Sequence, residues 1–283
     1  MNMIREPRQQ DEPIAQAVKS GVRDIVKEAG RAILQFYSGI AQADSHRPLE
    51  VTHKEDQSPL TEADLTSHRI IVEALARLTP HISVVSEEDG KRDPRHSSPE
   101  CFWLIDPLDG TKEFLAGSGE FTVNIALILQ GQPVWGVVGA PALDLLYWGG
   151  KGEGAFREQI HHIEPIRVAS WPVSGNPVRI VASKSHMTPE TLAFTQRFTP
   201  NELIQAGSSL KFCRVAEGSA DLYPRLGPTC EWDTGAAQAV VEGAGGHVFD
   251  LEGKALRYGK QEILNPYFVA SSVSSEIILS GLS

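Results

Sequence analysis

The most constraining stretch of this sequence is Phe102–Thr111, where an apolar run leads directly into two aspartates. The apolar residues Phe102–Ile105 predict a short buried strand. Asp106 and Asp109 follow at its end, and Pro107 between them favours an extended backbone for Asp106. The pattern therefore predicts a strand end at which two carboxylates lie close together.

The neighbouring residues add further polar groups to the same strand end. Gly110 permits a tight reversal of the chain, and Thr111 could open a short helix. With the carbonyl of Leu108, this end offers carboxylate, carbonyl and hydroxyl oxygens beside free backbone N–H groups. Such a set suits a hard divalent cation that shares its ligands with a phosphate. An acidic turn with a capping threonine would give the same local pattern. Only other parts of the sequence can distinguish a metal site from such a turn.

A second predicted strand also ends in carboxylates. Ile82–Val85 has the composition of a strand, and Glu87, Glu88 and Asp89 follow it before Gly90. Taken alone, these acids would form a solvated turn. If the two strands lie side by side in one sheet, however, their acidic ends converge, and ligand sites favour such strand ends.

Two further acids stand at predicted helix starts. Thr61 is the expected N-cap of a helix with Asp64 near its third position, and Asp233 directly precedes a helix predicted from Thr234. Helix capping alone would explain both acids. Gathered at one place, four acids would repel one another and raise each other's pKa: Glu87, Asp106, Asp109 and Asp233. Divalent cations would remove this repulsion, which favours a metal site over a bare acid cluster.

The remaining sequence predicts two regions of different organisation. A long amphipathic helix is expected from Ile14 to near Gly39, and closely spaced strands between 121 and 148 indicate an antiparallel meander. Beyond the Pro- and Gly-containing stretch 170–177, strands and helices alternate, as in an α/β layer. We therefore expect a flexible extension at 1–13, an α+β metal-binding domain at 14–170 and an α/β substrate domain at 171–283.

The composition limits the classes of function that this protein can have. The chain has 283 residues, of which 41% are hydrophobic, and a formal net charge of −10. This charge argues against nucleic-acid binding, and an acidic protein needs metal ions or selected cations to hold a phosphorylated substrate.

Three cysteines without zinc-site spacing fit a reducing compartment. No signal peptide or transmembrane run is evident, so a cytoplasmic protein is expected; peripheral membrane contact and the choice between monomer and homodimer stay open.

Longer motifs resemble a known family. Trp103–Thr111 and Trp232–Asp233 resemble two signatures of the inositol monophosphatase superfamily of lithium-sensitive phosphatases, and Ser86–Glu88 and Thr61–Asp64 match further signatures in the right order. The resemblance covers nearly everything from Ile14 to Phe268. Within the superfamily, the bacterial 3′(2′),5′-bisphosphate nucleotidases are the members that two stretches resemble most: Asp106–Leu127 and Gly207–Asp233.

The resemblance implies a layered α-β-α-β-α sandwich and Mg²⁺-dependent hydrolysis of a phosphomonoester with two or three ions. Asp64 and Thr111 match residues that orient the attacking water, and Glu87 shares in that role. The residues that match metal ligands are Glu87, Asp106, Leu108 through its carbonyl, Asp109 and Asp233. The expected substrate contacts include several of the same residues: Glu87, Leu108, Asp109, Gly110, Thr111, Ser183, His186, Gly207, Lys211 and Asp233.

The implied substrate is adenosine 3′,5′-bisphosphate or its 5′-phosphosulfate relative. The resemblance places this reaction in sulfur assimilation, where it clears a by-product of sulfate activation. Taken alone, Lys211 and His186 would be interpreted as a solvated helix lysine and a loop histidine. The resemblance favours contacts of both side chains with the second phosphate. An inositol-1-phosphate or fructose-1,6-bisphosphate phosphatase would use the same metal motifs, because function resides in the site and not in the fold. A metal- or nucleotide-binding regulator without catalysis is the alternative from another class.

Overall fold

The computed structural model describes residues 14–41, 51–53, 59–89, 100–183 and 188–280. Two long helices form its first layer: α1 (Gln16–Ala41) and α2 (Glu62–Leu78). The apolar positions of α1 recur at helical spacing, and Val22, Ala29 and Ile33 are fully buried. The helix predicted from Ile14 to near Gly39 is therefore confirmed. Between the helices, β1 (Val51–His53) and β2 (Pro59–Thr61) pair as a small antiparallel sheet.

The second layer is a seven-stranded sheet. Its strands are β3 (Ser83–Ser86), β4 (Cys101–Asp109), β5 (Thr122–Leu129), β6 (Gln132–Ala140), β7 (Leu145–Gly150), β8 (Gly154–Gln159) and β9 (His162–Ile166). They follow one another in chain order across the sheet. β3 and β4 run parallel, whereas each later pair is antiparallel. The expected meander is thus confirmed, with two strands more than the sequence predicted.

The second half of the chain builds a five-stranded sheet in the order β11-β10-β12-β14-β13. These strands are β10 (Val178–Ala182), β11 (Asn201–Gln205), β12 (Leu222–Arg225), β13 (His247–Asp250) and β14 (Phe268–Ser271). The helices of this half are α4 (Pro189–Thr195), α5 (Leu210–Ala216), α6 (Gly235–Gly243) and α7 (Ser275–Leu279). The alternation of strands and helices predicted beyond residue 177 is confirmed, while β14 and α7 were not predicted.

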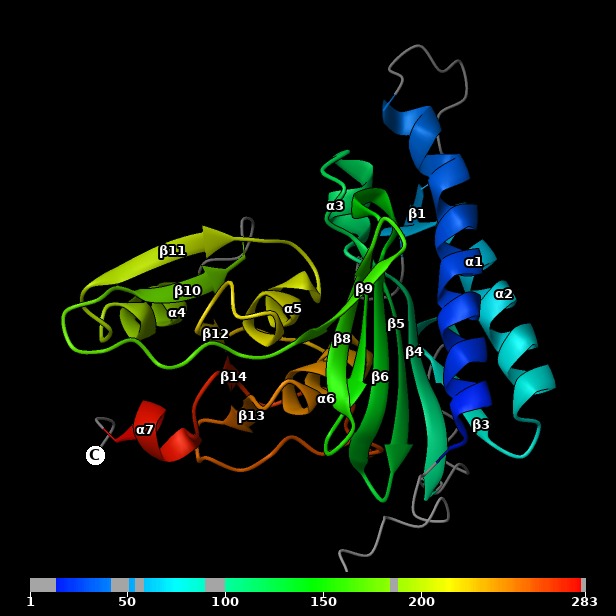
Figure 1. The fold of residues 1–283 in the computed structure, drawn as a ribbon. Coiled ribbons are helices and arrows are strands. Elements are labelled where there is room, and N and C mark those ends of the chain that lie inside the picture. Colours follow the sequence, from blue (N-terminus) through cyan, green and yellow to red (C-terminus); the bar gives the residue numbers. More distant parts are fainter. Residues whose placement is uncertain (1–13, 42–50, 54–58, 90–99, 184–187, 281–283) are drawn as a thin grey trace, which may run out of the picture.

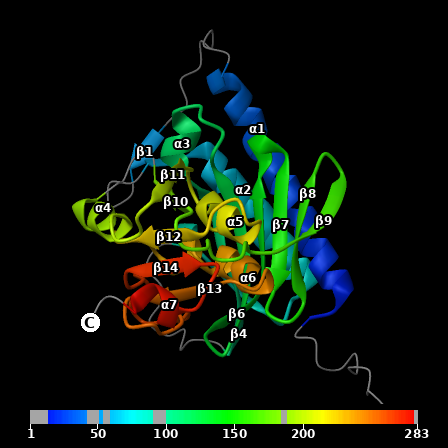
Figure 2. The same cartoon turned by 60° about the vertical axis from the view of Figure 1, so that its left-hand side comes forward.

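These elements stack as five layers (Figures 1 and 2). α1 and α2 cover the outer face of the seven-stranded sheet, and α5 and α6 lie between the two sheets. α4 and α7 contribute Phe194 and Ile278 to a separate cluster on the far face of the five-stranded sheet. The expected α-β-α-β-α sandwich is confirmed. No helix within the described ranges combines the length and apolar character that a membrane span requires.

The two halves meet through one shared core. Its buried side chains include Leu104 from the first sheet and Val181 from the second. α6 rests directly on β6, because a Cβ placed on Gly136 would lie only 2.4 Å from the backbone oxygen of Ala236. Glycine is therefore required at this position for the two halves to approach. The first large sheet ends at Ile166 and the second begins after it, but the division into domains at residue 170 stays a prediction.

Candidate active site

The parallel pairing of β3 and β4 brings two acidic strand ends together. Ser86 is in register with Ile105, so Glu87 and Asp106 follow at the same edge of the sheet. The charge of Glu87 contributes to the raised pKa of Asp106, which places the two carboxyl groups near one another. The convergence expected from the sequence is therefore present.

A β-bulge determines how Asp106 and Asp109 are presented. The sequence predicted that the strand ends before Asp106, but β4 continues through Pro107 to Asp109. Asp106 pairs with Asn124 and Asp109 with Thr122, so β4 has one residue more than β5 between these pairs. In a regular strand, side chains three positions apart point to opposite faces, and the extra residue returns them to the same face. The bulge thus allows both aspartates to face one site.

Three carboxylates from two regions of the chain form a compact cluster. Asp106, Asp109 and Asp233 each place an oxygen within 4.8 Å of the oxygens of the other two. Asp233 is the last residue of the short 3₁₀ helix η3 (Glu231–Asp233), and one residue, Thr234, separates it from α6. The second half of the chain therefore completes a site that begins on the first sheet.

Burial makes this cluster unfavourable in the absence of cations. Asp106 is only 1% exposed, and its Oδ2 atom has no hydrogen-bond partner among the described residues. Burial first, and then the charges of Glu87, Asp109 and Asp233, raise the pKa of Asp106 well above its usual value. Burial and the neighbouring carboxylates likewise raise the pKa of Asp233. An unsatisfied oxygen among like charges is what a divalent cation would relieve, so these residues fit a metal site.

Hydrogen bonds from the second half of the chain also fix Asp109. Its Oδ2 atom accepts hydrogen bonds from the backbone N–H of Ser209, at 2.7 Å, and from the Ser208 hydroxyl. The Thr122 hydroxyl bridges the hydroxyls of these two serines. This arrangement could not be predicted from local sequence patterns, because the two serines lie about 100 residues after Asp109. The orientation of Asp109 therefore depends on the contact between the two halves.

Asp64 combines a structural role with a contact to the site. It forms the expected capping box with Thr61, whose backbone N–H donates to Asp64 Oδ2 at 2.8 Å. The Thr111 hydroxyl donates to Asp64 Oδ1 at 3.2 Å, and it also lies 3.3 Å from the Leu108 carbonyl. Thr111 begins α3 (Thr111–Leu115) directly after Gly110, whose φ is +88°. The capping interpretation of Asp64 is correct, and it leaves the other carboxylate oxygen available to Thr111.

A pocket of about 130 Å³ adjoins the acid cluster. Asp109, Gly110 and Asp233 line one part of it, and Ser183 and Lys211 line another. Four other predicted contacts are not among the residues that line this pocket: Glu87, Leu108, Thr111 and Gly207. The backbone of Gly207 packs against Glu120, whose backbone oxygen would lie 2.7 Å from an added Cβ. His186 lies outside the described residues.

Two basic side chains line the pocket, Lys211 and Arg225, and only Lys211 was predicted from the sequence. Lys211 is 6% exposed, and its Nζ donates to the Ser208 carbonyl at 2.6 Å. Burial, with the nearby charge of Arg225, lowers the pKa of Lys211 to about 8. Arg225 also lines the pocket, and its buried Nε has no partner among the described residues. A basic residue after a predicted strand was the available signal for Arg225. Two neighbouring cations indicate an anion site.

The sequence matches the inositol monophosphatase family over residues 15–279. This chain belongs to that family.

Relatives with known names agree with this assignment. The chain is 45% identical over 248 residues to the 3′(2′),5′-bisphosphate nucleotidase CysQ of Salmonella typhimurium, covering 87% of this chain and 96% of the relative. It is 43% identical to CysQ of Escherichia coli K12 over 88% of this chain and 98% of the relative. Among solved structures, CysQ from Bacteroides thetaiotaomicron superposes with a TM-score of 0.79 at 37% identity, covering 92% of this chain and 98% of that one.

Proposed function

We propose that this protein is a Mg²⁺-dependent phosphatase that removes the 3′-phosphate from adenosine 3′,5′-bisphosphate. The observation that carries the proposal is the acid cluster of Asp106, Asp109 and Asp233 beside a pocket that contains Lys211 and Arg225. A bisphosphate has one phosphate for each of these regions. The names of the CysQ relatives support the same substrate.

The residues suited to hold the metal ions are the carboxylates and carbonyl predicted from the sequence: Glu87, Asp106, Leu108, Asp109 and Asp233. When bound, two or three Mg²⁺ ions would activate the attacking water and stabilise the leaving ribose oxygen. The chain itself contributes the fixed positions of the ligands. The bulge in β4 presents Asp106 and Asp109 together, and the turn at Ser208–Ser209 holds Asp109 in place.

Asp64 and Thr111 are suited to orient the attacking water. When the Thr111 hydroxyl donates to Asp64 Oδ1, its oxygen is left to accept a hydrogen bond from a water molecule. This contact would fix one O–H bond of the water and leave a lone pair for attack on phosphorus. The backbone N–H groups of Gly110 and Thr111 are suited to hold oxygens of the phosphate that is cleaved.

Lys211 and Arg225 are suited to bind the second phosphate. Their mutual repulsion and the burial of Lys211 disfavour the charged pair without an anion, as the lowered pKa of Lys211 indicates. A 5′-phosphate would offset both effects, because each cation could donate charge-assisted hydrogen bonds to its oxygens. Ser183 lies at the same pocket and is a further polar contact.

The test is phosphate release from adenosine 3′,5′-bisphosphate, inositol-1-phosphate and fructose-1,6-bisphosphate, each with Mg²⁺ and with EDTA. We expect activity only with Mg²⁺ and a preference for the nucleotide of about tenfold or more in kcat/KM, which corresponds to roughly 1.4 kcal/mol. A preference for either sugar phosphate would overturn the assignment of the second-phosphate contacts. No turnover of any of the three would support a non-catalytic regulator.

A further inference from the structure

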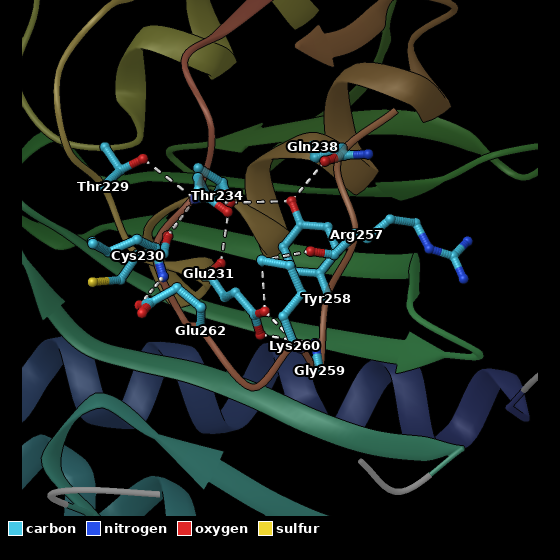
Figure 3. Close-up of polar contacts among 12 residues, drawn as sticks. Thr229, Cys230, Glu231, Thr234, Gln238, Arg257, Tyr258, Gly259, Lys260 and Glu262 are labelled. Atoms are coloured by element: carbon cyan, nitrogen blue, oxygen red, sulfur yellow. Dashed lines mark hydrogen bonds and ion pairs between the residues drawn. The ribbon is translucent and has the colours of Figure 1, made fainter. Parts of the chain in front are cut away.

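The turn that carries Asp233 is anchored by a buried acid, Glu231, to which the sequence analysis and the proposed function assign no role. Figure 3 shows Glu231 pointing toward the backbone of Gly259 and the side chain of Lys260. Glu231 is 1% exposed and accepts hydrogen bonds from Gly259 N at 2.8 Å, from Lys260 N at 2.9 Å and from Lys260 Nζ at 2.7 Å. A buried carboxylate with this set of donors is rigidly held.

The segment that receives Glu231 is also bonded to the first sheet. The backbone N–H of Tyr258 donates to Gly131 O at 3.2 Å, and Arg257 Nη2 donates to Gln130 O at 3.0 Å. Both acceptors lie in the turn between β5 and β6. The segment 257–260 therefore connects the Glu231 carboxylate with the sheet that carries Asp106 and Asp109.

Further hydrogen bonds fix the residues that flank Asp233. The backbone N–H of Cys230 donates to Asp233 Oδ2 at 2.7 Å, and the Cys230 carbonyl accepts a hydrogen bond from Asn265 at 2.7 Å. The Thr234 hydroxyl donates to the Glu231 carbonyl at 3.1 Å and lies 3.1 Å from the Tyr258 hydroxyl (Figure 3). Residues on both sides of Asp233 are thus held by the downstream stretch 258–265.

We infer that Glu231 is a positioning residue, which sets the distance of Asp233 from the two aspartates of the first sheet. Like charges push Asp233 away from Asp106 and Asp109, so the turn must be held against this repulsion. The charge of Glu231 is compensated by Lys260, and Glu231 can therefore anchor the turn without enlarging the acid cluster. Residues that do not bind the metal but orient its ligands commonly change metal affinity by 10–100-fold when they are substituted. The inference depends on the proposed metal site.

The test compares Glu231→Gln with Glu217→Gln, using Mn²⁺ as the probe. Glu217 is another buried carboxylate with several donors, including Tyr147 and Arg214, but it belongs to a different network. Free Mn²⁺ is measured by electron paramagnetic resonance without substrate, and urea unfolding of the metal-free proteins is measured in parallel. We expect both variants to lose stability. Only Glu231→Gln should raise the Mn²⁺ dissociation constant, by about tenfold or more.

The outcomes distinguish a failure of the proposed metal site from a failure of the positioning role inferred for Glu231. If the wild type binds no Mn²⁺, the proposed metal site itself fails. If the wild type binds Mn²⁺ and Glu231→Gln binds it equally well, or if Glu217→Gln weakens binding as much, Glu231 has only a structural role and the inference is overturned. Should Glu231→Gln not fold, Lys260→Met tests the same contact while the two backbone donors remain. That variant should weaken Mn²⁺ binding by a few-fold, and an unchanged dissociation constant would overturn the inference.

Discussion

Replacing Asp106 by Asn should stabilise the metal-free protein although it removes a metal ligand. The reason is that Asp106 is almost fully buried, has one oxygen without a hydrogen-bond partner among the described residues, and lies among three other acids. Asn keeps the Oδ1 acceptor that the Leu108 N–H uses at 3.1 Å. Its amide can also donate to a neighbouring carboxylate, which replaces repulsion by a hydrogen bond.

The magnitude follows from the cost of an unsatisfied buried polar group. That cost is about 1–3 kcal/mol, so Asp106→Asn should raise the free energy of unfolding by a similar amount in EDTA at pH 8. Since the folded-state pKa of Asp106 is raised, the folded protein binds more protons than the unfolded chain between the two pKa values. The wild type therefore loses stability as the pH rises through this window, and the advantage of Asn disappears near pH ~4.

Metal ions should reverse the order of stability. A ligand at 100 times its dissociation constant stabilises the folded state by about 2.7 kcal/mol, and saturating Mg²⁺ should give this gain to the wild type but little of it to Asp106→Asn. Urea unfolding with EDTA and with Mg²⁺ measures both effects. Asp24→Asn on the exposed face of α1 is the control and should change stability by less than about 0.5 kcal/mol. An Asp106→Asn protein less stable than wild type in EDTA would show that the Asp106 carboxylate does not destabilise the metal-free protein.

Three further predictions concern the site, and a fourth concerns Glu217, a carboxylate in a separate network. Asp109→Asn should lower kcat by more than about 100-fold while circular dichroism stays that of the wild type; near-normal kcat would remove Asp109 from the metal site. Thr111→Val should lower kcat by on the order of 100-fold with little change in KM, and an unaltered kcat would exclude its role toward water. Because the pKa of Lys211 is about 8, the ratio of kcat/KM for adenosine 3′,5′-bisphosphate to that for adenosine 3′-phosphate should fall as the pH rises through 8; Lys211→Met should abolish this dependence. Glu217→Gln should cost about 2–4 kcal/mol of unfolding free energy at pH 7. Burial raises the pKa of Glu217, but hydrogen bonds from Tyr147 and Arg214 outweigh it and lower the pKa, so the loss should shrink as the pH falls below about 4.

Local patterns in the sequence were sufficient to predict where most of the acidic residues of the site lie. A strand is recognisable from its own residues, so the acidic ends of β3 and β4 could be predicted, and the parallel pairing of these strands confirmed that they converge. Asp64 was equally accessible, because the capping box lies within four residues of sequence. These features depend on short-range chemistry that a single sequence records.

Features that depend on distant partners could not be predicted in the same way. The bulge in β4 is defined by its register with β5, and a strand end before Asp106 was the wrong expectation as a result. β8 and β9 are only partly buried strands with many polar residues, and pairing along the sheet makes them strands. The anchoring of Glu231 involves Gly259 and Lys260, which no local pattern connects to it.

The proposed metal site is tested most directly by anomalous diffraction at the manganese absorption edge, measured on crystals soaked in Mn²⁺. We expect at least one strong anomalous peak bounded by the carboxylates of Asp106, Asp109 and Asp233. Occupied Mn²⁺ positions elsewhere, with no anomalous peak among these three aspartates, would contradict it.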